Sequence, residues 1–239
     1  MNFELSYKPF GAFAILIEWP SIIDEVIIQD IVAFEKEIEN KESVLEAVIA
    51  YNSLLVRYHE PILNVSLKIQ ELQVLYDLKR PIQKQSQKLW EIPVCYDLSF
   101  GLDLKEISRQ KKQPLEEIIA LHSSVDYLIY FIGFQPGFLY LGGLHKKIHT
   151  PRKSNPRLRV DKGSLGIGGK QTGIYPQDSS GGWNIIGKSP VDFFTISNEQ
   201  PCFAKPGDRI RFSPINLNTF YQIEKEVSNG THILRSKLL

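Results

Sequence analysis

The chain has 239 residues, of which 43% are hydrophobic and 23% charged, as in a globular protein of one large or two ordinary domains. Lys and Arg total 28 against 27 for Asp and Glu, which excludes the strong positive field of a nucleic-acid or anionic-membrane protein. The apolar runs are too short to cross a bilayer, and Cys95 and Cys202 form neither a metal spacing nor a disulfide framework. We therefore expect a cytoplasmic protein without nucleic-acid or membrane partners.

The first 96 residues have the pattern of a small α+β domain. Its elements are expected, in order, at residues 2–19 (strands), 21–40 (helix), 44–50 and 53–58 (strands), 65–78 (helix) and 90–96 (strand). The order β-α-β-β-α-β matches a ferredoxin-like sandwich that ends near Tyr96. The polar residues 79–88 are predicted to be a loop within this domain.

Residues 97–239 are predicted to form a second, β-rich domain. Two short helices are expected within residues 103–122, and a buried strand follows over residues 125–134. Short strand-like pieces separated by Gly and Pro come next, a pattern typical of a barrel or sandwich. The last stretch, residues 224–239, is expected to form a polar surface tail.

Glycine and basic residues are concentrated in the middle of this second domain. Twelve of the sixteen glycines lie within residues 131–190, interspersed with Phe, Tyr, Ile, Leu and Trp, which favours tight turns in a β structure over a flexible linker. The stretch also carries a basic run whose only acid is Asp161: Lys146, Lys147, Arg152, Lys153, Arg157, Arg159 and Lys162. Backbone N–H groups of Gly-rich turns beside Arg and Lys suit an anion site, and a solvated basic loop is the alternative.

His122 lies between a predicted helix and the predicted buried strand. It is a candidate general acid or base, because imidazole titrates near neutral pH. The alternative is a structural role as a partner for the C-terminal end of the helix. The sequence leaves both roles open.

Polar residues that follow a Gly-Gly turn suit the orientation of a small ligand, namely Gln171, Thr172 and Tyr175. Gly181 and Gly182 would bring backbone N–H groups close to such a ligand, with Trp183 as a wall. The alternatives are ordinary turn chemistry with a satisfied buried tyrosine, and a tight hairpin beside a core tryptophan. No Gly-rich nucleotide motif and no metal-ligand spacing accompanies these residues.

Several segments resemble the allophanate hydrolase subunit 1 family, which includes the B-type subunit of 5-oxoprolinase (PxpB) and the kinase inhibitor KipI. These segments are GFQPGFLYLGGL, TPR, PRLRV, KGSLGIGGKQTGIYP and GGWNIIGKSP, with YNSLLVRYHE, WEIPVCYD and EEIIALHSS earlier in the chain. The resemblance covers roughly residues 3–215 and departs from the family mainly at Asp161 and Ser180, where the family usually has proline. It implies that the ferredoxin-like domain is followed by a cyclophilin-like β barrel over residues 97–239.

The resemblance also implies a subunit of an ATP-dependent 5-oxoprolinase, which converts 5-oxoproline to glutamate. The implied cosubstrate is ATP with Mg²⁺, and the implied partners are a homologous C-type (subunit 2) protein and a third 5-oxoprolinase component, with no activity expected from the chain alone. Two alternatives are a KipI-like inhibitor of a sensor histidine kinase and a urea- or allophanate-metabolising carboxyltransferase-type subunit. Residue type and position make His122 the candidate catalytic residue, and the candidate substrate or anion binders are Arg152, Arg157, Arg159, Gln171, Thr172, Tyr175, Gly181, Gly182 and Trp183.

Overall fold

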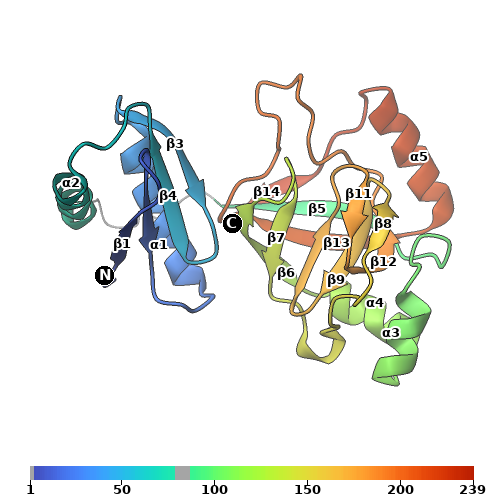
Figure 1. The fold of residues 1–239 in the computed structure, drawn as a ribbon. Helices are drawn as coiled ribbons and strands as arrows, with labels where there is room; N and C mark the ends of the chain where they lie inside the picture. Colours follow the sequence, from blue (N-terminus) through green and yellow to red (C-terminus); the bar gives the residue numbers. More distant parts are fainter. Residues whose placement is uncertain (1–2, 79–86) are drawn as a thin grey trace. The chain divides into compact units, whose positions relative to one another are not determined.

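The computed structural model describes residues 3–78 and 87–239, and the chain divides into two compact units (Figure 1). Unit 1 comprises residues 1–86 and unit 2 comprises residues 87–239. The predicted loop at residues 79–88 lies outside the described residues, except for its last two positions.

Unit 1 is a four-stranded antiparallel sheet with two helices (Figure 1). Its elements in order are β1 (Ser6–Pro9), β2 (Ala14–Glu18), α1 (Glu25–Glu39), β3 (Val44–Ile49), β4 (Ser53–Tyr58) and α2 (Val65–Leu78). Helix α1 begins later than predicted because Asp24, not Ser21, is the N-cap, and its carboxylate accepts a hydrogen bond from the Val26 amide at 2.7 Å.

The prediction that residues 90–96 complete a ferredoxin-like unit was wrong, and so was a domain boundary at residue 96. Strand β5 (Lys88–Cys95) belongs to unit 2, where it pairs in parallel with β13 (Arg209–Ile215) along nearly its whole length. The buried carboxylate of Asp208 strengthens this pairing by accepting a hydrogen bond from Trp90 Nε1 at 3.0 Å. In unit 1 the sheet order is β1-β2-β4-β3, so β1 occupies the edge beside β2 that the last strand of a ferredoxin-like sheet takes.

A buried carboxylate joins three elements of unit 1. Asp30 on α1 is fully buried, and its Oδ2 accepts hydrogen bonds from Trp19 Nε1 at 2.8 Å and from the Tyr76 hydroxyl at 2.6 Å. The rings of Trp19, Phe34 and Tyr76 pack edge to face around it. Because a buried charge is costly unless it is hydrogen-bonded, these donors hold α2 against α1 and the end of β2.

Unit 2 contains a closed barrel flanked by helices (Figure 1). After β5 its elements are α3 (Leu104–Lys111), α4 (Leu115–Ser123), β6 (Asp126–Ile132), β7 (Leu139–Gly142), the 3₁₀ turn η1 (Lys146–Ile148), β8 (Arg157–Val160), β9 (Ser164–Gly168), β10 (Gln171–Ile174), β11 (Ser179–Gly181), β12 (Asn184–Lys188), β13, α5 (Leu217–Ser228) and β14 (Ser236–Leu238). The two predicted short helices and the predicted run of short strands are confirmed.

The barrel closes because the two strands at the ends of the sheet order, β12 and β5, pair with each other. Within the described residues the order is β12-β9-β10-β7-β6-β13-β5, and β12 returns to β5 through the pair Lys188 and Cys95. Strand β14 adds to β5 outside this ring, and β8 pairs with β11 as a separate two-stranded ribbon. Closure removes exposed sheet edges and buries an apolar core inside the ring.

The end of the chain is more ordered than the predicted polar tail. Helix α5 begins at an Asn216 cap, whose side chain accepts a hydrogen bond from the Thr219 amide at 2.9 Å, and it buries Phe220. The final strand β14 pairs with β5. In the described part of the chain, no helix has the length and apolar character needed to span a membrane.

We predict that Tyr76→Phe destabilises unit 1 by roughly 1–3 kcal/mol, because buried Asp30 loses a donor. Urea unfolding followed by circular dichroism measures the change. Tyr221→Phe is the matched control, since that ring is 56% exposed and keeps its ring contacts as phenylalanine. Equal stability of the two variants would contradict the role assigned to the buried carboxylate.

Candidate functional site

His122 occupies the core of unit 2. Its Nδ1 lies 2.8 Å from the Tyr96 hydroxyl, and its Nε2 lies 2.8 Å from Thr172 Oγ1. All three side chains are buried, and the imidazole stacks on Phe212 with ring centroids 4.9 Å apart. The structure therefore brings together two of the predicted residues, His122 and Thr172, but inside the protein.

The hydrogen bonds around His122 determine its tautomer. Thr172 Oγ1 donates to the Gly166 carbonyl at 3.0 Å, so the same oxygen accepts from an Nε2–H group of His122. Nδ1 then accepts from the Tyr96 hydroxyl, and the ring is neutral. Burial lowers the pKa of His122 to about 3, which agrees with a neutral ring. With both nitrogens paired to buried groups, the geometry favours a structural role over the predicted acid/base role.

A second group of predicted residues meets at the surface of the barrel. The Arg152 guanidinium lies over the Trp183 ring, 5.7 Å from the ring centroid, and its Nη2 donates to Gln171 Oε1 at 3.4 Å. The pKa values of Tyr140 and Tyr175 are both raised, chiefly because the phenols are buried. The positive charge of Arg152 offsets part of this rise at each phenol. Arg152 is thus within electrostatic reach of both phenols. We call this group, formed by Arg152, Gln171, Tyr140, Tyr175 and Trp183, the Arg152 face.

The aromatic residues of the Arg152 face belong to a cluster that also includes Phe138. The Trp183 ring contacts Phe138, Tyr140 and Tyr175, with centroid separations of 5.4, 6.4 and 6.5 Å. Sequence reasoning identified Tyr175 and Trp183 but missed Phe138 and Tyr140, which alternate along the segment before and within β7. That alternation was the available signal, because it places both rings on one side of a strand.

Glycines allow this cluster to assemble. A Cβ atom on Gly168 would lie 2.4 Å from Trp183 Nε1, and one on Gly181 would lie 2.3 Å from the Tyr175 hydroxyl oxygen. These positions accept no side chain without displacing the rings. Gly182 differs, because the nearest atom to its Cβ would be 3.6 Å away, and its carbonyl accepts a hydrogen bond from the Lys153 amide at 2.7 Å.

The other two predicted anion-binding arginines already have carboxylate partners. Arg157 Nη2 donates to Asp103 Oδ1 at 2.7 Å, and Arg159 contacts Asp161 at 3.0 Å and Asp178 at 2.8 Å. Among the described residues, Arg152 contacts no carboxylate. Of the three arginines, Arg152 therefore has the charge most available to an anionic ligand.

Asp103 organises the basic segment, and sequence reasoning missed it. This buried carboxylate accepts from Arg157 Nη2 and Lys153 Nζ, both at 2.7 Å, and from the Ile185 amide at 2.7 Å. Burial raises the pKa of Asp103, but these hydrogen bonds outweigh burial and hold the pKa below its usual value. No local sequence pattern predicts that Asp103 pairs with Arg157, because the two residues are 54 positions apart in the sequence.

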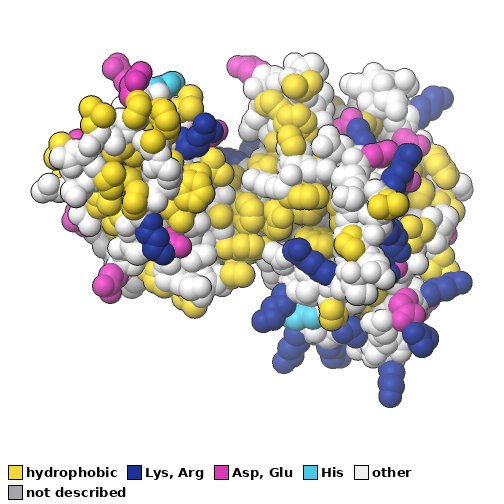
Figure 2. Space-filling view, in the orientation of Figure 1, with side chains coloured by type: hydrophobic (Ala, Val, Ile, Leu, Met, Phe, Trp, Pro, Cys, Tyr) yellow, Lys and Arg dark blue, Asp and Glu magenta, His cyan; other side chains and the backbone are white. Residues whose placement is uncertain are grey.

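Part of the basic run remains solvated. Figure 2 shows Lys and Arg side chains gathered at the end of unit 2 that carries α3 and η1. Lys146 and Lys147 are exposed there, and among the described residues the Lys147 ammonium approaches one carboxylate, that of Glu117 at 3.7 Å. For these two lysines the geometry favours the solvated loop over the anion site.

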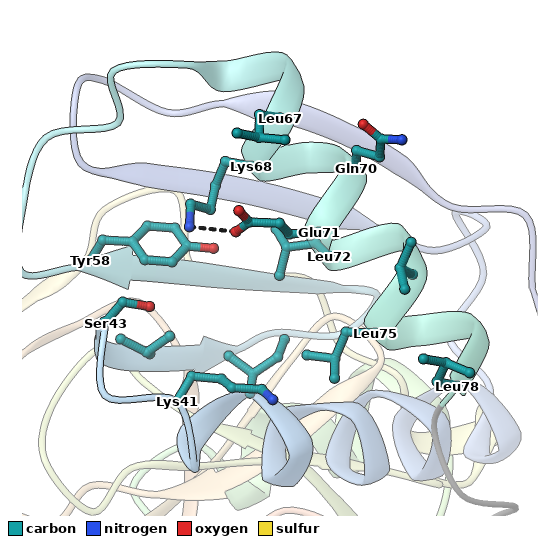
Figure 3. Close-up of a pocket in the computed structure, with 13 residues that line it drawn as sticks. Lys41, Ser43, Tyr58, Leu67, Lys68, Gln70, Glu71, Leu72, Leu75 and Leu78 are labelled. Carbon is teal, nitrogen blue, oxygen red and sulfur yellow. Dashed lines mark hydrogen bonds and ion pairs between the residues drawn. The ribbon is translucent and has the colours of Figure 1, made fainter.

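Unit 1 contains a cavity of about 690 Å³ that sequence reasoning did not predict (Figure 3). Leucines of α2 line one side, including Leu67, Leu72 and Leu75, and the strand residue Tyr58 lies opposite. Lys68 forms an ion pair with Glu71 at 2.5 Å and lies 5.2 Å from the Tyr58 ring centroid. None of the predicted site residues lines this cavity, and its paired charges leave a mainly apolar surface.

The amino-acid sequence of this chain is similar to those of known proteins. The sequence profile of a family described as carboxyltransferase domain, subdomain C and D, matches residues 5–204. The B-type subunit of 5-oxoprolinase from Escherichia coli O157:H7 is 46% identical over 114 residues, 48% of this chain and 52% of that protein. Its counterpart from Haemophilus influenzae is 38% identical over 181 residues, 75% of this chain and 84% of that protein. The chain thus spans about half the length of the E. coli relative and most of the H. influenzae relative.

Solved structures show the same fold within longer chains. The protein TTHA0988 is 31% identical with a TM-score of 0.76, and the match covers 85% of this chain and 40% of that one. The urea amidolyase of Kluyveromyces lactis has a TM-score of 0.81 over all of this chain and 16% of its own, at 17% identity, which supports the fold alone.

We predict that His122 makes unit 2 sensitive to acid. The unfolded chain has an ordinary histidine pKa near 6.5, so between pH 6.5 and about 3 it binds a proton that the folded chain does not. The stability that neutral His122 contributes is complete above pH 6.5 and is lost as the pH falls. Urea unfolding should show wild type losing up to roughly 2 kcal/mol more than His122→Gln between pH 6.5 and 5. Equal pH slopes would contradict a neutral buried ring.

We also predict that Gly168→Ala destabilises unit 2 by about 1–3 kcal/mol and alters tryptophan fluorescence, because the added methyl group collides with the Trp183 indole. Gly182→Ala is the control, since its methyl group meets only ordinary contacts, and it should stay within about 0.5 kcal/mol of wild type. Thermal unfolding and fluorescence spectra distinguish the two. A Gly168→Ala protein as stable as the control would show that the ring does not need this space.

Proposed function

Because the chain belongs to the family of the carboxyltransferase domain, subdomain C and D, we propose that it is the B-type subunit of an ATP-dependent 5-oxoprolinase. Such an enzyme converts 5-oxoproline to glutamate. The observation that carries the proposal is the similarity to the B-type 5-oxoprolinase subunit of H. influenzae, which extends over 84% of that protein. The 46% identity to the E. coli protein supports the same substrate.

The reaction demands charge stabilisation more than acid/base chemistry from this chain. A five-membered lactam is a stable amide, and phosphorylation of its carbonyl oxygen makes the carbon open to attack by water. Such a step needs cations near the transferred phosphoryl group and donors that hold the substrate in place. These needs match a chain in which His122 is buried and neutral while Arg152 is exposed.

We assign the substrate carboxylate to Arg152. A guanidinium presents N–H donors in a fork that matches a carboxylate, and the Arg152 guanidinium lies over the Trp183 ring, 5.7 Å from its centroid. The Gln171 amide, which Arg152 contacts at 3.4 Å, orients the lactam. Tyr140 and Trp183, which pack edge to face, supply apolar contacts for the small ring, as in other sites for small ligands.

The complete activity is assigned to an assembly. The relatives are named as subunits, and TTHA0988 contains the matched region within a chain more than twice as long. We propose a homologous C-type protein and a third 5-oxoprolinase component as partners, in the cytoplasm, with ATP bound at the level of the complex. The described residues contain no group of three or more His, Cys, Asp or Glu side chains suited to a metal ion, so Mg²⁺ is assigned to the bound ATP.

We predict that Arg152→Ala raises the KM for 5-oxoproline by about tenfold or more in the reconstituted complex. The lost charge-assisted hydrogen bonds are worth roughly 1.5–3 kcal/mol, and each 1.4 kcal/mol corresponds to a factor of about ten. Arg152→Lys should recover only part of the affinity, because lysine lacks the planar fork. The measurement is 5-oxoproline-dependent ATP hydrolysis.

Arg109→Ala is the control for lost surface charge. Arg109 is exposed, and within the described part of the chain its side chain pairs with Glu106 alone, on the same helix, so its removal should leave the KM unchanged. An unchanged KM in Arg152→Ala would show that Arg152 does not bind the substrate carboxylate. If the rate of ATP hydrolysis by the wild-type complex does not depend on 5-oxoproline, the proposed function itself is refuted.

A further inference from the structure

Unit 2 has a small cavity that the proposed function does not use. Its volume is about 220 Å³, and its polar lining consists of Ser99, Arg157, Arg159, Asp161, Ser164 and Lys188. Neither Arg152 nor Trp183 belongs to the lining, so the cavity is separate from the Arg152 face. At this size it is smaller than the ~300–1,000 Å³ typical of sites for drug-sized ligands.

The arginine in the wall of this cavity has an unused donor. Arg157 Nη2 is held by Asp103 at 2.7 Å, while Nη1 is buried and has no hydrogen-bond partner among the described residues. A buried donor without a partner is destabilising, and an acceptor in the cavity would satisfy it. Because Asp103 fixes one side of the guanidinium, the other side is preorganised to donate to an acceptor in the cavity.

Two further polar groups line the same space. Lys188 contacts no carboxylate among the described residues, and its Nζ lies 5.6 Å from the Phe100 ring centroid. Ser164 is buried, and its hydroxyl makes no hydrogen bond to another described residue. The cavity therefore offers an ammonium, a guanidinium nitrogen and a hydroxyl, all of which donate.

The charges around the cavity favour an anion on its buried side. Asp103 is shared by Arg157 and Lys153, so this trio carries one excess positive charge, and Lys188 adds a second. Asp161 also lines the cavity, but it pairs with Arg159 at 3.0 Å. Arg159 is 74% exposed and is also paired with Asp178, so the negative charge lies at the open rim.

We propose that this cavity binds a small tetrahedral oxyanion, namely inorganic phosphate or the terminal phosphoryl group of a nucleotide. Three donors from separate elements, β8, β9 and β12, converge on it, as expected of a phosphate site. The cavity has room for the anion but not for a whole nucleotide. The proposal does not depend on 5-oxoprolinase activity, and either could fail without the other.

Inorganic phosphate titrated into the full chain at constant ionic strength tests the proposal. Binding should be saturable in calorimetry and should shift the backbone amide signals of Ser164, Ile185 and Lys188 in ¹H–¹⁵N spectra. Lys188→Ala should weaken phosphate binding by roughly tenfold or more. Arg157→Lys keeps the partner of Asp103 but removes the second nitrogen of the fork, and it should weaken binding similarly.

Lys170→Ala is the matched control, because this exposed lysine lies in the turn between β9 and β10, outside the cavity. It should bind phosphate as wild type does. Displacement of bound phosphate by ATP at concentrations well below those of phosphate assigns the site to a nucleotide phosphoryl group, and the failure of ATP to displace phosphate assigns it to the free anion.

Three results would overturn the site. One is the absence of saturation up to about 10 mM phosphate, which leaves less than ~3 kcal/mol of binding free energy. Another is equal weakening in Lys170→Ala and Lys188→Ala, which indicates non-specific charge attraction. The third is a Lys188→Ala protein that binds as wild type does. If Arg157→Lys loses its native circular dichroism spectrum, the Lys188→Ala comparison alone decides.

Discussion

One buried carboxylate, Asp103, sets the arrangement of the basic segment of unit 2. It accepts from Lys153, from Arg157 and from the backbone of β12, so it ties the start of α3 to both the loop and the barrel. Because breaking a buried charge pair leaves an uncompensated charge, this contact is costly to disrupt. Asp103 pairs with Lys153 and Arg157, whereas Arg152, which contacts no carboxylate among the described residues, lies over the Trp183 ring.

Glycine and aromatic residues supply the complementary constraint. Glycines on β9 and β11 leave room for the Trp183 and Tyr175 rings, which pack edge to face, and Arg152 lies over the Trp183 ring. The buried hydrogen bonds from Tyr96 through His122 to Thr172 link α4 to β10 inside the core of unit 2.

The sequence predicted the elements that depend on neighbouring residues. It did not predict contacts between residues that lie far apart in the chain. Short strands separated by Gly and Pro indicated a barrel or sandwich, of which the structure shows the barrel, and the two short helices expected within residues 103–122 are α3 and α4. The alternation in β5 identified a strand but not its partner, because β13 lies more than a hundred residues later. For the same reason the run of arginines indicated an anion site, while the carboxylates that occupy Arg157 and Arg159 emerged only from the folded chain.

The concentration of 5-oxoproline in host cells that lack this chain tests the assignment most directly. Loss of a required 5-oxoprolinase component blocks consumption of the lactam. We therefore predict that 5-oxoproline accumulates in the deletion strain and returns to its ordinary level when the wild-type chain is restored. An unchanged concentration of 5-oxoproline after deletion would contradict the assignment.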